Sequence, residues 1–233
     1  MSVNGLSPKR SARWLSPRSD PNGLVPLLAP LPKAVLAFGK PPTEGGQAAA
    51  KMTRVEDVRR EDLSPSQQEL YDDITRRRPR PSIGGPFAIW LNIPQIAAPA
   101  NALTNYFRSS AKLDQRLIEL IVLLTCRESS VKYAWSVHAP LARAAGLSQD
   151  TIDAIDARKR PAFERDDEAL IYDLVTELLS TKALCTATFE RAEAALGRDG
   201  LVEAVSCAGF YAMVGLVLGA YDVAPQLGGP ALS

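Results

Sequence analysis

The feature that most constrains this chain is a helical spacing of apolar residues that runs from Leu63 to Val223. In successive segments, apolar residues recur three or four positions apart, so that they fall on one side of a helix. No segment shows the alternation of apolar and polar residues, bounded by turn residues, that is typical of a β-strand. The pattern therefore predicts an all-α helix bundle over residues 57–223.

Capping residues indicate where the helices begin and end. Ser64, Pro65 and Gln67 form an N-terminal capping sequence with proline at the first helical position. Gly146 is suited to the position just after a helix C-terminus. The last predicted helix is apolar nearly all round, so we expect it to be buried on both sides. The predicted helices are 65–77, 94–107, 115–127, 131–145, 149–157, 166–179, 186–196 and 200–221.

Residues 1–52 differ in composition from the rest of the chain. They contain eight prolines, and seven basic residues against two acidic ones, without a sustained helical period. Such a segment buries too little apolar surface to offset the entropy lost on ordering, which predicts a disordered extension. Two alternatives remain open. One is an organellar transit peptide, which the prolines disfavour because such peptides form amphipathic helices. The other is that translation of the protein begins at Met52 and that the assigned start is misplaced.

The composition of the whole chain argues against several classes of protein. Hydrophobic residues make up 46% of the 233 residues, enough for a globular core, and the formal net charge of +1 favours neither nucleic acid nor an anionic membrane as partner. The longest apolar run, residues 204–217, is too short and interrupted to span a membrane, so we expect a soluble protein. The odd number of cysteines fits a reducing compartment, so we expect the cytoplasm. Three cysteines without a C-x-x-C pair, and one histidine, predict no common type of metal site.

Glu119 and His138 are the residues that most suggest chemistry. Glu119 is a single acid within a strongly apolar helical stretch, and His138, the only histidine, follows on the next predicted helix. The short connection makes the two helices neighbours, so the carboxylate can hydrogen-bond one imidazole nitrogen and leave the other for a substrate proton. A structural contact between two helices would use the same pair, and the residues alone leave both interpretations open.

The residues around this pair resemble a known family. They are similar to the carboxymuconolactone decarboxylase-like family, part of the wider alkylhydroperoxidase D-like superfamily. The resemblance covers residues 57–223 and implies the alkylhydroperoxidase D-like helix bundle as the fold. It rests on Glu119 and the apolar run after it, Tyr133-x-Trp135-x-x-His138, Gly146-Leu147-Ser148, Gly85-Pro86-Phe87 and Phe210-Tyr211.

Decarboxylases of this family act in aromatic catabolism and remove carbon dioxide from a small unsaturated lactone acid without a cofactor. For this chain the resemblance implies a lyase that needs no cofactor and acts on a small organic acid or lactone. His138 would be the acid/base residue and Glu119 its orienting partner. An arginine would hold the substrate carboxylate. Candidate substrate-binding residues are Tyr133 and Trp135, which would otherwise belong to the core, and Arg116 and Arg127.

The chain also departs from the family pattern. Ala134, Val137 and Ile118 stand where many members have an acidic residue, a second histidine and an arginine. We therefore expect a more apolar pocket, and a less charged substrate, than in an enzyme that handles dicarboxylates.

Two further functions remain open. Hydroperoxidase members carry a C-x-x-C dithiol at positions that are Val131 and Ala134 here, so dithiol peroxidase activity is not expected. A thiol-dependent peroxidase could use Cys126 instead, although a buried, inert thiol would explain that residue too. The third hypothesis is a non-catalytic binding protein of the same fold. The resemblance also implies a homo-oligomer, either a trimer or a hexamer.

Overall fold

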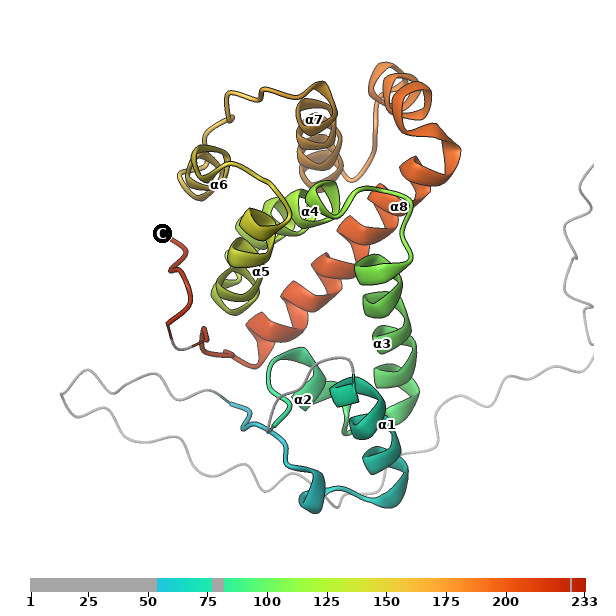
Figure 1. Cartoon of the computed structure of the whole chain (residues 1–233), viewed down its shortest axis with the longest axis vertical. Helices are drawn as coiled ribbons and strands as arrows, with labels where there is room; N and C mark the ends of the chain where they lie inside the picture. Colours follow the sequence, from blue (N-terminus) through green and yellow to red (C-terminus); the bar gives the residue numbers. More distant parts are fainter. Residues whose placement is uncertain (1–53, 77–81, 227) are drawn as a thin grey trace, which may run out of the picture. The chain divides into compact units, whose positions relative to one another are not determined.

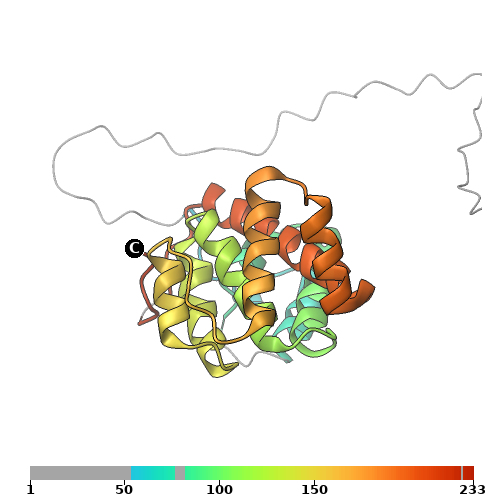
Figure 2. The same cartoon turned by 90° about the horizontal axis from the view of Figure 1, so that it is seen from above.

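Helix α4 (Gln115–Glu128) is the central element of the fold. The computed structural model describes residues 54–76, 82–226 and 228–233. In it, α4 packs against α5 (Lys132–Ala144), α7 (Asp166–Thr181) and α8 (Thr186–Ala220) (Figure 1, Figure 2). Every α4 residue from Arg116 to Cys126 is buried, as expected for a helix that is apolar on several sides.

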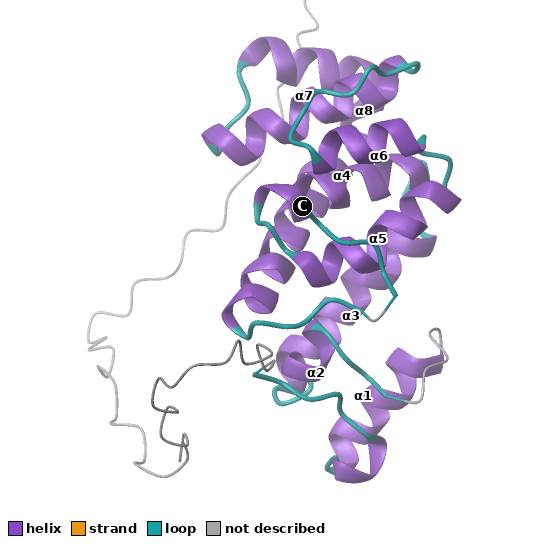
Figure 3. Ribbon diagram, turned by 90° about the vertical axis from the view of Figure 1, so that its left-hand side faces the viewer, coloured by secondary structure: helices purple, strands orange, loops and turns teal. Residues whose placement is uncertain are grey.

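The remaining helices cover this centre. Helix α1 (Pro65–Arg76) packs on α3 (Pro94–Ser109), and the short α2 (Pro86–Trp90) contacts both α3 and α8. Helix α6 (Gln149–Asp156) lies against α4 and α5. A 3-10 turn, η1 (Arg60–Asp62), precedes α1. Figure 3 shows helices and loops but no strand among the described residues, where the β pairing is an isolated bridge between Val58 and Ile83. The all-α prediction is confirmed.

Most predicted helix ends agree with the structure to within two residues. The Ser64 amide donates a hydrogen bond to Gln67 Oε1 at 3.0 Å, and Ser148 accepts one from the Thr151 amide at 3.1 Å. Gly146 has a φ of +104°, which suits the position after a helix end. One boundary prediction needs correction: Val131 is the N-cap of α5 rather than its first helical residue.

The predicted break between residues 196 and 200 is present as a kink. Gly197 has φ 69° and ψ 169°, a conformation open to glycine, and it interrupts the helical backbone inside α8. The two predicted helices, 186–196 and 200–221, are therefore the two arms of α8.

The second arm of α8 is not buried on all sides, contrary to the sequence prediction. Its inner side packs in the core, but Val202, Met213 and Leu216 are exposed, Leu216 by 76%. With a mean hydropathy of 1.9 over 18 residues, α8 is also long and apolar enough to cross a membrane, although 56% of that window is buried within the chain. The sequence prediction of no membrane-spanning helix rests on Ser206 and Gly209, which interrupt the apolar run. The mean hydropathy of the 18-residue window stays high even with these two residues included.

The packed unit continues beyond residue 223. The Gln226 amide donates to Ser136 Oγ at 3.0 Å, Leu232 is buried, and the Ser233 amide donates to Asp156 Oδ1 at 2.9 Å. This final segment therefore covers parts of α5 and α6. The predictions made for residues 1–52 lie outside the described residues.

Candidate active site

His138 and Glu119 form a buried pair between α5 and α4. Nδ1 of His138 lies 2.8 Å from Oε2 of Glu119, and the two residues are 7% and 6% exposed. An ionised carboxylate can only accept a hydrogen bond, so beside it Nδ1 carries the proton and donates. The second ring nitrogen, Nε2, has no hydrogen-bond partner among the described residues. The contact expected between these two side chains is therefore present, with one nitrogen left over.

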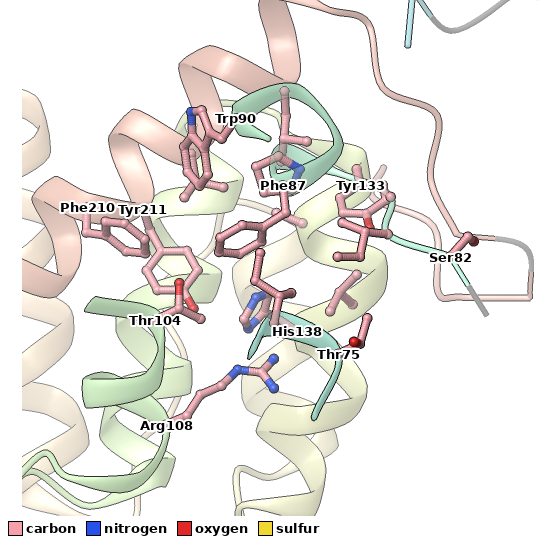
Figure 4. Close-up of a pocket in the computed structure, with 18 residues that line it drawn as sticks. Thr75, Ser82, Phe87, Trp90, Thr104, Arg108, Tyr133, His138, Phe210 and Tyr211 are labelled. Atoms are coloured by element: carbon pink, nitrogen blue, oxygen red, sulfur yellow. The ribbon is translucent and has the colours of Figure 1, made fainter. Parts of the chain in front are cut away.

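The imidazole of His138 borders a cavity of about 300 Å³. Helices α1, α2, α3, α5 and α8 all contribute to its walls, as does the loop before α2 (Figure 4). The size, and a lining that is mainly apolar and aromatic, are typical of a site for a small organic molecule. Its aromatic lining consists of Phe87, Trp90, Tyr133, Phe210 and Tyr211.

Three hydroxyl groups of the lining are already used within the protein. Thr75 donates to the Tyr71 carbonyl, Thr104 donates to the Ala100 carbonyl, and Ser82 donates to Asp57 Oδ2, each at 2.8 Å. These hydroxyls can accept a hydrogen bond from a ligand, but their protons are committed to other groups.

Arg108 brings a permanent positive charge to the cavity, and the sequence analysis missed it. It lies near the end of α3, is exposed, and has no ion-pair or hydrogen-bond partner among the described residues. Figure 4 shows its side chain extending from α3 toward His138. No sequence signal marked this residue, because a basic side chain in the last turn of a helix is already explained by the helix dipole.

Tyr211 is the second residue that the sequence analysis missed. The sequence indicates Tyr211 only as part of the Phe210-Tyr211 pair, which is one of the segments that carry the family resemblance. Its ring lies edge to face with the His138 imidazole, with 5.1 Å between centroids and an interplanar angle of 86°. Burial raises the pKa of Tyr211 well above its usual value, so the phenol stays protonated.

Of the two predicted aromatic contacts, Tyr133 lines the cavity and Trp135 does not. Tyr133 packs closely against Gly85, where a Cβ atom would lie 2.5 Å from the phenol oxygen. Trp135 is buried and borders a separate hollow beneath α6 and the final segment of the chain. It therefore belongs to the core, the alternative that the sequence analysis had left open.

Neither predicted arginine borders the cavity. Arg116 is buried and pairs with two carboxylates of α7, Glu168 Oε1 at 2.5 Å and Asp167 Oδ2 at 2.7 Å. Arg127 donates to the Ser233 carbonyl oxygen at 2.6 Å and lies 3.6 Å from Asp156 Oδ1. Both side chains connect elements of the fold, and Arg108 occupies the place at the cavity that they were expected to fill.

The cysteines do not border the cavity either. Cys126 and Cys207 are buried, and burial raises the pKa of both thiols far above the usual value, so neither is a ready nucleophile. Cys185 is exposed at the N-cap of α8. Within the described ranges, no three His, Cys, Asp or Glu side chains gather in a way that could hold a metal ion.

Comparison with known proteins identifies the architecture. Neither a protein-family model nor a curated protein matches the sequence, whereas solved structures match the fold. A peroxidase-related, uncharacterized protein from Silicibacter sp. TM1040 aligns with 78% of this chain and 96% of its own, with a TM-score of 0.62 and 14% identity. The debrominase Bmp8, in complex with 2,3,4-tribromopyrrole, aligns with 76% of this chain and 94% of its own, with a TM-score of 0.61 and 12% identity.

A third match is a protein of unknown function from Agrobacterium tumefaciens that has been proposed to be the antioxidant defence protein AhpD. It aligns with 60% of this chain and 96% of its own, with a TM-score of 0.54 and 20% identity. The chain has the alkylhydroperoxidase D-like fold. This confirms the predicted fold, which the chain shares with an enzyme, the debrominase.

Within this alkylhydroperoxidase D-like fold, the two positions predicted to replace the dithiol lie at the start of the helix that carries His138. Val131 caps the start of α5, and Ala134 is part of the cavity lining. The cavity thus has an alkyl side chain beside the imidazole where the resemblance places a thiol in the hydroperoxidases.

Proposed function

We propose that this protein is a cofactor-independent enzyme that transfers a proton to or from a small organic acid or lactone, with His138 as the acid/base residue. The observation that carries the proposal is the placement of His138. One nitrogen of its ring is fixed by Glu119, and the other, beside a cavity of about 300 Å³, has no partner in the part of the chain that the structure describes. A structural histidine in a core would be expected to have both of its nitrogens satisfied.

The proposed reaction is a decarboxylation. The bond between the substrate carbon and its carboxylate breaks, carbon dioxide leaves, and the electron pair enters the conjugated system of the substrate. The protonated Nε2 of His138 then gives its proton to a substrate carbon and is protonated again from water. One proton is consumed in each turnover, and no external oxidant or reductant is needed. Glu119 stabilises the imidazolium form that is present before the proton passes to the substrate.

Arg108 supports an organic acid as substrate. Its guanidinium has no partner among the described residues and can form two hydrogen bonds to a carboxylate. The rest of the lining is mainly aromatic, which favours a flat or unsaturated molecule. The debrominase complex with 2,3,4-tribromopyrrole is a precedent for a small ring compound bound to this fold.

The thiol-dependent alternative has less support. A peroxidatic cysteine must present a thiolate to the solvent or the substrate. Cys126 is buried, its pKa is raised, and it is not part of the cavity lining. A non-catalytic binding protein could use Arg108 to hold a ligand but would not need a histidine paired with a carboxylate, so we place this role below the enzymatic one.

The function can be tested with a panel of unsaturated lactone acids and conjugated keto acids, followed by proton NMR in deuterated water. The native protein should consume at least one compound and place deuterium at a single carbon. His138→Gln should slow this turnover by about 10²- to 10⁴-fold, the usual contribution of a general acid or base. Its thermal midpoint should stay within a few degrees. Turnover that survives this substitution would exclude His138 as the acid/base residue.

We also propose that the chain self-associates through the outer side of α8. This side presents Val202, Met213 and Leu216 without a charged residue among them, and beside them Gly209 allows close approach of another helix. Sedimentation velocity should show an oligomer for the native protein and a smaller species for Leu216→Glu. Identical sedimentation of the two proteins as monomers would remove this proposal.

A further inference from the structure

The hydroxyl of Tyr211 is a polar group that has no hydrogen-bond partner within residues 54–76, 82–226 and 228–233. No described residue forms a hydrogen bond with it, although Tyr211 itself is only 7% exposed. The fully buried, unpartnered side-chain atoms of the described residues are Asn101 Oδ1 and Arg127 Nε, so the phenol oxygen is not sealed in the core. The cavity that Tyr211 lines is the space from which a ligand would reach this oxygen.

The ring of Tyr211 lies beside the proposed acid/base residue, so its hydroxyl belongs to the same site. The ring of Tyr211 contacts the imidazole of His138 edge to face, and both side chains line the same cavity. In Figure 4, Tyr211 reaches the cavity from α8, Arg108 from α3 and His138 from α5. The Tyr211 hydroxyl, the Arg108 guanidinium and Nε2 of His138, none of which has a partner among the described residues, thus belong to one mainly aromatic cavity.

The three groups differ in what each can offer a ligand. Arg108 offers a positive charge, and Nε2 of His138 can take up or release a proton. Because burial keeps Tyr211 protonated, its phenol is not a base but a neutral hydrogen-bond donor. A fixed neutral donor in a site of low polarity is suited to an oxygen atom on which negative charge develops during a reaction.

We propose that Tyr211 is a second catalytic residue, which donates a hydrogen bond to a substrate carbonyl oxygen while His138 moves the proton. This inference rests on the function proposed above and narrows its substrate class. The substrate is an acid whose reacting carbon is conjugated to a ketone or lactone carbonyl.

The electron flow explains the role of each group. When the carbon–carboxylate bond breaks and carbon dioxide leaves, the electron pair moves through the double bonds and converts the carbonyl into an enolate. The hydrogen bond from Tyr211 stabilises the enolate oxygen more than it stabilises the neutral carbonyl, which lowers the barrier. The enolate then takes a proton on carbon from Nε2 of His138, and the carbonyl re-forms.

The binding test uses two probes that share a ring but differ in charge, 4-nitrophenolate and the neutral 4-nitroanisole, with the full-length protein. Tyr211→Phe keeps the ring and its contact with His138 but removes the hydroxyl. It should weaken 4-nitrophenolate binding by about 10- to 100-fold and leave 4-nitroanisole binding unchanged. Tyr221→Phe, at the exposed C-cap of α8, is the matched control and should change neither. Equal phenolate affinity for the native protein and Tyr211→Phe would overturn the proposal, as would an equal loss for both probes.

The kinetic test uses any substrate that the panel reveals. Tyr211→Phe should lower kcat by about 10²-fold, with little change in KM and with the same pH profile, because the hydrogen bond strengthens only as charge develops. If Tyr211→Phe leaves both probe binding and kcat unchanged while His138→Gln abolishes turnover, the inference fails and the proposed function stands. If the phenolate effect appears while His138→Gln remains active, the proposed role of His138 fails and the donor role of Tyr211 stands.

Discussion

Helix α4 carries two buried polar clusters that lie side by side in sequence but differ in what they leave free. Arg116 pairs with Glu168 and Asp167 on α7, and both carboxylates are directed at the guanidinium. Glu119, three residues further on, holds one nitrogen of His138 and leaves the other at the cavity. The first cluster is closed, because its charges are matched within the protein. The second is open, because one hydrogen-bonding position awaits a ligand.

The number of filled hydrogen-bonding positions distinguishes a structural buried ionisable group from a functional one. Burial of a charged group is costly, so both clusters need partners. In a closed cluster every charged group has a partner within the protein, so a substitution in that cluster should lower the free energy of unfolding. In an open cluster one hydrogen-bonding position stays unused, so a substitution in that cluster should lower ligand binding or turnover. The following changes test that separation, in order of expected effect.

Arg116→Met should give the largest change, in stability. It leaves Glu168 buried without its cation, and breaking a buried ion pair in this way costs about 3–5 kcal/mol. Urea unfolding should show this loss, while the turnover per folded molecule stays close to that of the native protein. The control is Arg165→Met, which removes the exposed partner of Asp167 and should barely move the unfolding midpoint. A small loss for Arg116→Met would mean that the cluster is not structural.

Glu119→Gln should give the opposite pattern. The amide has the shape of the carboxylate but lacks its charge, so the imidazolium form of His138 is less stable and turnover should fall by about 10- to 100-fold. Thermal unfolding should change by only a few degrees. Glu128→Gln, on the exposed end of the same helix, is the matched control. If Glu119→Gln mainly lowered stability, the open cluster would be structural as well.

The closed cluster should also determine part of the acid sensitivity of the fold. Burial alone would raise the pKa of Asp167, but hydrogen bonds from Arg165 and Arg116 outweigh it and lower the pKa to about 2. The pKa of an aspartate in the unfolded chain is about 3.9. Asp167 therefore stabilises the fold above that pH and loses this contribution as the pH falls toward about 2. Urea midpoints measured across this range should fall less steeply for Asp167→Asn than for the native protein. Parallel slopes for the two proteins would contradict this assignment.

Cys126→Ala should give the smallest change. The thiol is buried and protonated and does not line the cavity, so substrate turnover should be unaltered. Peroxide consumption with a thiol reductant should be equally low before and after the substitution. A rate that depends on Cys126 would favour the thiol-dependent function over the proposed one.

Much of the fold could be predicted from the sequence, because its signals are local. The capping sequence at Ser64, the glycine after α5 and the apolar spacing of α4 each specify a helix or its end without reference to the rest of the chain. The Glu119–His138 contact could also be predicted, since a short connection places the two helices together. The break at Gly197 was visible as a gap between two helical patterns.

The other side of the cavity could not be predicted in this way. Arg108 and Tyr211 share a cavity with His138 only because α3, α5 and α8 all pack against α4, and these helices are far apart in sequence. Arg116 and Arg127 were chosen because they flank the site along the chain, but the rotation of α4 turns Arg116 toward α7 instead. The exposed stripe of α8 was missed because hydropathy does not report which side of a helix has neighbours.

Gly85 has a consequence for how this site could change over time. Its φ is +64°, and a Cβ atom at this position would overlap the ring of Tyr133, which lines the cavity. Any side chain at position 85 would therefore displace that ring, so this glycine cannot change while Tyr133 is present, whereas Tyr133 can change while the glycine is kept. A smaller residue in place of Tyr133 would remove the overlap and enlarge the cavity, while the positive φ would still favour glycine at position 85. The pair is thus a natural point at which selection could exchange one substrate size for another while leaving the acid/base pair intact.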